Sequence, residues 1–134
     1  MTTITAQLNP ARAGVLRAAL TLDAVVTAAN GAAYLAAFAL LDDALGVPQA
    51  LLIGVGAFLL AYAAFVGRLA SAQRPNRTAV VAVIAANAVW ALDSVLLLAV
   101  DGFTPTLAGQ IVVAVQAAGV AALAGLQYAG LRRA

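Results

Sequence analysis

The chain has 134 residues, of which 65% are hydrophobic and only 9% charged, and its net charge is +2. Soluble domains are roughly 45–50% apolar and about 25% charged, so too few polar side chains are present to cover a water-facing surface, and a bilayer is the expected solvent. Because the chain has neither cysteine nor histidine, it lacks disulfides, thiol nucleophiles and the usual zinc and haem ligands, and we expect no metal and no cofactor.

Four apolar stretches are long enough to cross a bilayer, which takes about 20 residues of helix. In chain order they are residues 18–41, 48–66, 79–100 and 106–131. The connections between them are short, and short connections place consecutive helices antiparallel. The sequence therefore predicts an all-α membrane protein whose single domain, residues 18–131, is an up-down bundle of four transmembrane helices.

Turn residues mark the first and third connections. In the first, Gly46 is suited to end one helix and Pro48 to begin the next. In the third, Gly102 and Pro105 stand in the same order. Both connections are therefore predicted to be tight turns between antiparallel helices.

The charged residues predict how the bundle is oriented. Every arginine lies before the first stretch, between the second and third, or after the fourth, whereas Asp42, Asp43 and Asp101 lie in the other two connections. Arginines in short loops mark the cytoplasmic face. We therefore expect a multi-pass protein of the bacterial cytoplasmic (inner) membrane, with residues 1–17 and 132–134 both cytoplasmic. Arginines spread over three short segments do not form a nucleic-acid footprint, so no nucleic-acid partner is expected.

Polar side chains within the stretches recur at helical spacing. Buried polar groups are costly in a bilayer, so they tend to face the bundle interior and to carry function. In the first stretch, four polar residues at spacings of four, three and four share one face. No residue is assigned a catalytic role, and the candidates for ligand or ion binding are Asp23, Thr27, Asn30, Tyr34, Tyr62, Asn87, Trp90, Asp93, Ser94, Gln116 and Gln127.

Two interpretations of this polar set stay open. In the first, the side chains hydrogen-bond between helices and hold the bundle together, each contact contributing roughly 0.6–2 kcal/mol. Asn30 and Asn87, both near the midplane, would then pair and join the two halves. In the second, the polar stripes line a small cavity on the bundle axis.

Asp23 is the polar residue that most needs a partner, because an ionised carboxylate near hydrocarbon is expensive. Arg17 or Arg68 can extend towards it from the cytoplasmic side, and Tyr62 can donate a hydrogen bond. One interpretation makes Asp23 half of a structural ion pair. The other makes it a proton or cation site.

Two further patterns concern packing. A shift of 64 residues maps Asp23 onto Asn87 and Arg68 onto Arg132, which indicates a parallel duplication of a helix hairpin, with chance similarity as the alternative. Rows of small residues drive helix association within or between protomers, so a homo-oligomer or a place in a larger membrane complex is expected. Those rows are Gly54, Gly56, Ala57 and Ala61 on the second stretch and Gly119, Ala122, Gly125 and Ala129 on the fourth.

Three short motifs carry a resemblance to a known group of proteins. They are Leu22-Asp23-Ala24 with Asn30, Asn87 to Trp90 followed by Ser94, and the ending from Gln127 to Arg133. With these motifs the chain resembles the small, uncharacterised four-helix membrane proteins of high-GC bacteria such as actinobacteria, and that resemblance implies no activity. By weaker analogy it is similar to the small multidrug resistance transporters, which carry one membrane-embedded acid in the first helix. Those transporters use glutamate where this chain has Asp23, and many have little charge bias.

Three functions remain open from the sequence. The first is a non-catalytic membrane protein that binds a lipid or another apolar small molecule, or that packs as a subunit in a membrane assembly. The second is a proton- or cation-coupled transporter with Asp23 as the coupling site. The third is a lipid-modifying membrane enzyme with Asp23 or Asp93 and Tyr62 as acid and base. The lack of His, Cys, Glu and Lys argues against the enzyme.

Overall fold

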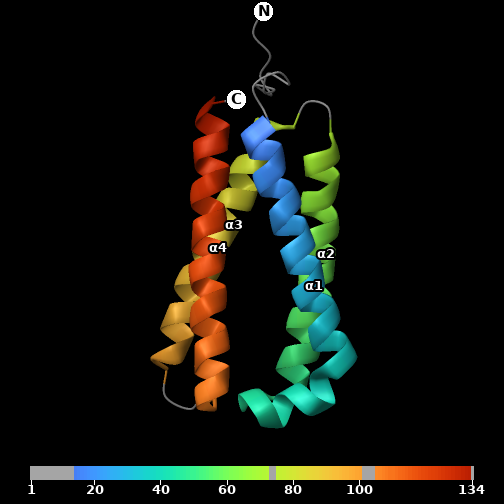
Figure 1. The fold of residues 1–134 in the computed structure, drawn as a ribbon, viewed down its shortest axis with the longest axis vertical. Helices are drawn as coiled ribbons and strands as arrows, with labels where there is room; N and C mark the ends of the chain where they lie inside the picture. Colours follow the sequence, from blue (N-terminus) through green and yellow to red (C-terminus); the bar gives the residue numbers. More distant parts are fainter. Residues whose placement is uncertain (1–13, 73–74, 101–104, 134) are drawn as a thin grey trace, which may run out of the picture.

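The computed structural model describes residues 14–72, 75–100 and 105–133, and these form four helices (Figure 1). Helix α1 covers Gly14–Leu45, α2 Gln49–Ser71, α3 Arg77–Leu98 and α4 Leu107–Arg133. All four are long and apolar enough to cross a membrane. The predicted all-α, four-helix architecture is confirmed, and the chain is a multi-pass membrane protein.

Helix α1 is longer than the predicted stretch and is bent. Its backbone leaves helical geometry at Ala37, with φ −128° and ψ 22°, and the part that follows turns across the end of the bundle opposite the termini (Figure 1). Residues 42–45, expected in the first connection, are therefore helical. The turn itself is made at Gly46, whose φ of 66° is the left-handed conformation that glycine adopts most easily, and Pro48 then caps α2.

The four helices are arranged as two hairpins. Helix α1 packs along α2 and α3 along α4, α1 and α4 form the seam between the hairpins, and α2 and α3 scarcely touch. Within the first hairpin the backbones approach closely, because a Cβ on Gly31 would lie 2.9 Å from the carbonyl oxygen of Gly56. This contact leaves room for no side chain at either glycine.

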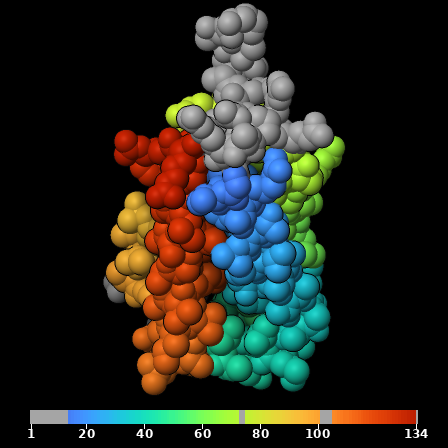
Figure 2. Space-filling view, turned by 45° about the horizontal axis from the view of Figure 1, so that its top comes forward, coloured from blue at the N-terminus to red at the C-terminus, as the bar shows by residue number. Residues whose placement is uncertain are grey.

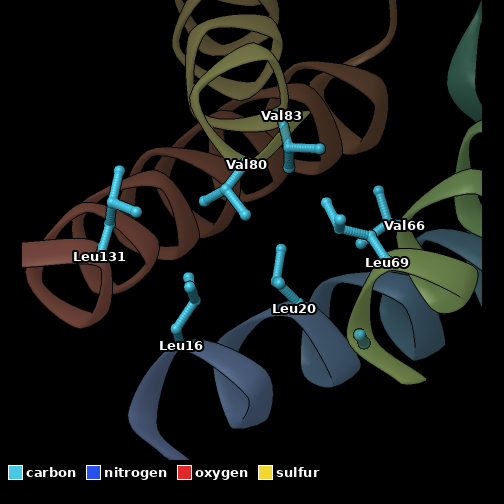
Figure 3. Packing of buried hydrophobic residues seen from close by; sticks show 8 residues of the cluster. Leu16, Leu20, Val66, Leu69, Val80, Val83 and Leu131 are labelled. Atoms are coloured by element: carbon cyan, nitrogen blue, oxygen red, sulfur yellow. The ribbon is translucent and has the colours of Figure 1, made fainter. Parts of the chain in front are cut away.

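The hairpins are joined at the end of the bundle that carries both termini, here called the terminal end. Apolar side chains from all four helices point toward one another there (Figure 3). Gly130 of α4 lies against Leu16 of α1, since a Cβ on the glycine would come 2.7 Å from the Leu16 backbone. The labelled members of this terminal core are Leu16, Leu20, Val66, Leu69, Val80, Val83 and Leu131.

A second junction lies at the opposite, distal end. The backbone N–H of Thr106 donates to the carbonyl oxygen of Leu45 at 3.0 Å, and its hydroxyl donates to that of Ala44 at 2.7 Å. A Cβ added to Gly109 would overlap the Leu45 carbonyl oxygen, so the backbones pack closely there as well. The bent part of α1 therefore reaches the start of α4, and the two hairpins are tied at both ends.

Positions 64 residues apart have matching burial in the two hairpins. Leu16 and Val80 are both buried, as are Asp23 and Asn87. Leu59 and Leu123 form a third buried pair. The hairpins therefore bury equivalent faces, and their common origin by duplication stays a prediction.

The predicted rows of small residues are mostly not at helix contacts. Gly56 lies at the crossing of α1 and α2, but a Cβ on Gly54, Gly119 or Gly125 would meet nothing within 4 Å. The four alanines of these rows are exposed. Close helix packing inside the chain involves instead Gly31, which lies against Gly56, and Gly130, which lies against Leu16. The oligomer contacts of these rows remain a prediction.

Gly130 and Gly125 offer a matched test of the seam between α1 and α4. We expect Gly130→Ala to destabilise the protein by about 1–3 kcal/mol, because the new methyl group forces α4 away from Leu16. Gly125→Ala should be neutral or slightly stabilising, since alanine favours a helix more than glycine does. Thermal unfolding in detergent measures both; equal melting temperatures for the two variants would contradict this packing.

Candidate functional site

A buried polar network lies one helical turn beyond the terminal core. Its centre is Asp23, which is 2% exposed, with Asn87 at 5% and Gln127 at 0%. The Asp23 Oδ2 atom accepts hydrogen bonds from Asn87 Nδ2 and Gln127 Nε2, both at 2.8 Å. The Oδ1 atom accepts one from Thr27 Oγ1 at 2.9 Å. Three neutral donors thus compensate the loss of water around this carboxylate.

Asn87 extends the network to the remaining helix. Its Oδ1 atom accepts a hydrogen bond from Tyr62 Oη at 3.1 Å, and its Nδ2 atom donates to Gln127 Oε1 at 2.9 Å as well as to Asp23. Tyr62 Oη also lies 3.4 Å from the carbonyl oxygen of Val83. One side chain from each of the four helices therefore belongs to a single hydrogen-bonded group.

This geometry corrects three expectations. Asn30 does not pair with Asn87, because Asn87 lies level with Asp23 and Asn30 is two turns, or roughly 10 Å, further along α1. Tyr62 donates to Asn87 rather than to Asp23. Among the described residues, the hydrogen-bond donors to the carboxylate are a hydroxyl and two carboxamides, whereas Arg17 Nη2 donates to the Ala72 carbonyl oxygen at 2.7 Å.

A cavity of about 710 Å³ lies between the two hairpins, on the distal side of the network. Small-molecule pockets usually measure about 300–1,000 Å³, so the volume suits a ligand. Its wall is mainly apolar, with side chains from all four helices. The polar candidates in the wall are Thr27, Asn30, Tyr34, Tyr62, Asn87, Trp90 and Gln116, whereas Asp23 and Gln127 lie behind it.

Aromatic rings cover the side of the cavity between α2 and α3. Phe58 stacks on Trp90 with ring centres 6.0 Å apart and planes 9° apart, and on Tyr62 at 6.1 Å and 25°. The rings bridge the two helices whose backbones scarcely touch. Phe58 is not among the residues predicted from the sequence, although its position four residues before Tyr62 places both rings on one helix face.

The opposite side of the cavity opens along the seam between α1 and α4. The seam is crossed by hydrogen bonds between Asp23 and Gln127 and, at 3.2 Å, from Tyr34 Oη to Gln116 Oε1. On each helix these crossings are eleven residues apart, or roughly 16 Å. Val26, a wall residue between them, is 42% exposed. In Figure 2 the atoms of α1 and α4 meet near the terminal end and part further down.

A smaller cavity of about 280 Å³ continues toward the distal end. Asp93 and Ser94 belong to its wall, and Tyr34, Trp90 and Gln116 belong to both walls. Asp93 is exposed, and Ser94 Oγ donates to the Trp90 carbonyl oxygen at 2.8 Å. The two carboxylates within the membrane-spanning helices therefore lie in separate places, Asp23 inside the network and Asp93 in the wall of the smaller cavity.

Comparison with protein-family models, with curated proteins and with solved structures finds no match for this chain. The class that the fold and the site define is a small four-helix membrane protein with an apolar cavity between two hairpins.

Removing the Asp23 carboxylate tests the network. Asp23→Ala leaves the buried N–H groups of Asn87 and Gln127 without their acceptor, which costs about 1–3 kcal/mol for each unsatisfied group. We expect a clear fall in melting temperature in detergent. Asp93→Ala is the matched control and should stay within about 0.5 kcal/mol of wild type, because Asp93 is exposed. A stable Asp23→Ala protein would mean that the network does not hold the helices.

Proposed function

We propose that the protein binds an apolar or amphipathic membrane molecule, such as a lipid, in the cavity between its hairpins, and that it does so without catalysis. The cavity carries this proposal, because it combines about 710 Å³ of space with a mainly apolar wall. Such a space in a membrane protein is filled most favourably by hydrocarbon, which regains the dispersion contacts that an empty cavity lacks.

The opening along the α1–α4 seam supports direct exchange with the bilayer. The wall residues Leu22, Val26 and Leu126 are 49%, 42% and 49% exposed, so they belong both to the cavity and to the outer surface. All of them are apolar and lie within membrane-spanning helices. A ligand can therefore pass between lipid and cavity without crossing water.

The position of Asp23 favours this function over the transporter and the enzyme. A coupling or acid–base carboxylate has to reach the transported ion or the substrate. Asp23 is 2% exposed and lies behind Thr27 and Asn87, both of which it binds. Ligand binding uses the cavity as it stands and needs no movement of the carboxylate.

Filling the cavity tests the proposal. Gly119 is in the wall, and a Cβ built on it meets nothing within 4 Å, so Gly119→Phe should occupy the space without disturbing the backbone. Gly125 on the same helix has equally open surroundings but is not in the wall, which makes Gly125→Phe the control. In native mass spectrometry from a gentle detergent, we expect a retained lipid-sized mass with wild type and Gly125→Phe and its loss with Gly119→Phe.

Retention of the same mass by both phenylalanine variants would place the ligand on the outer surface and contradict the proposal. Melting temperatures of the two variants provide the folding control. They should agree, because the Cβ atom meets nothing within 4 Å at either position.

We also propose that both termini face the cytoplasm, which the arginines of the terminal end support. The native chain has no cysteine, so single thiols report topology without background. A membrane-impermeant maleimide should label Asp43→Cys in intact cells and Ser71→Cys only after the membrane is opened. Both positions are exposed; Ser71 is the last residue of α2, near the terminal end, and Asp43 lies in the last turn of α1, at the distal end. The reverse labelling pattern would invert the topology.

A further inference from the structure

Resting on the proposed function, we infer the chemical class of the ligand: an uncharged lipid whose hydroxyl or carbonyl group is bound by Asn30. This inference goes beyond the size of the cavity, because it depends on which polar groups in the wall are already used. It also depends on where the charged side chains of the chain lie.

Most polar groups in the wall are occupied within the protein. Thr27 donates to Asp23, and Tyr62 donates to Asn87. Asn87 uses both its oxygen and its nitrogen in the network. These side chains line the cavity next to the polar network, but their hydrogen-bonding groups are already used within the protein.

Asn30 differs from them. It is half-buried in the cavity wall, and within the described part of the chain it makes no hydrogen bond. A carboxamide without a partner in hydrocarbon is costly, since each unsatisfied polar group there costs several kcal/mol. Its N–H₂ group donates and its carbonyl oxygen accepts, so a ligand hydroxyl or carbonyl satisfies it.

Neighbouring groups extend this binding position. Tyr34 lies one turn along α1 from Asn30 and donates to Gln116 Oε1. No described residue accepts from the Gln116 N–H₂ group, which is therefore available to a ligand as a donor. Both side chains are in the wall beside Asn30. The middle of the cavity therefore offers neutral donors in an otherwise apolar space.

The lack of charged side chains in the described cavity wall disfavours a ligand with an ionised head group. Among the described residues, the cavity wall contains no charged side chain. A phosphate or carboxylate there would lack a cation, and a buried charge without a counter-charge is strongly disfavoured. An ammonium group in this cavity meets no carboxylate among the described wall residues: Asp23 lies behind Thr27 and Asn87, and Asp93 belongs to the wall of the smaller cavity. A neutral group is the one that this wall accepts.

Trp90, the only tryptophan in the chain, provides the readout because it belongs to the cavity wall. Four eighteen-carbon chains brominated at mid-chain would be titrated in nanodiscs: octadecane, octadecanol, octadecanoate and octadecyltrimethylammonium. Bromine quenches tryptophan at short range, and Gly119→Phe supplies the background from probe dissolved in the bilayer. We expect octadecanol to bind at least about threefold more tightly than each of the others, as one net hydrogen bond predicts.

Asn30→Leu isolates the hydrogen bond. The variant keeps a side chain of similar size and loses no hydrogen bond within the described residues. We expect it to weaken octadecanol binding by about three- to tenfold and to leave octadecane binding unchanged. A purely steric effect of the substitution would weaken both probes equally and would overturn the role of Asn30.

Two other outcomes separate the inference from the function on which it rests. If Gly119→Phe abolishes quenching but a charged probe binds as tightly as octadecanol, the cavity binds ligands and the neutral-lipid inference is wrong. If all four probes quench wild type and Gly119→Phe equally, nothing enters the cavity and the proposed function itself fails.

Discussion

The rest of the structure depends on the hydrogen bonds that satisfy the Asp23 carboxylate. Apolar side chains alone do little to hold helices together in a bilayer, because the lipid chains are as apolar as leucine. A buried carboxylate, by contrast, is tolerated only where enough hydrogen-bond donors surround it, so it fixes the positions of the helices that supply them. Here every helix contributes to the same network: Asp23 and Thr27 from α1, Tyr62 from α2, Asn87 from α3 and Gln127 from α4. The rotation and depth of all four helices are therefore set at one level of the bundle.

The cavity follows from where the remaining close contacts lie. The hairpins meet at the terminal core, through Gly130 and Leu16, and again at the distal end, through Leu45 and Thr106. Between these junctions α1 and α4 are linked by Tyr34 and Gln116, while α2 and α3 are bridged mainly by stacked rings. Helices tied at both ends and separated by long side chains in the middle enclose space. The same arrangement leaves the seam between α1 and α4 open in the middle of the bundle.

The polar residues consequently serve in two ways, and the division follows depth. At the level of Asp23 the polar side chains hydrogen-bond to one another, and the carboxylate accepts from three of them. Two turns further along α1, Asn30 stands in the wall without a described partner. At the level of Asp23 the polar side chains act as contacts between helices. At the level of Asn30 they line the cavity. The proposals for ligand binding rest on the second level.

The sequence by itself determined the number of helices and the membrane environment, because hydropathy and helix length are local properties of each stretch. It also identified the polar stripes, since helical spacing alone puts Asp23, Thr27, Asn30 and Tyr34 on one face. Only the tertiary structure decided which side chains meet, because partners depend on the relative depth and rotation of separate helices. Asn87 therefore binds Asp23 instead of Asn30, and Gly31 and Gly130 carry close contacts that the small-residue rows did not predict. The bend at Ala37 likewise changed the distal end without any proline or glycine at that position to signal it.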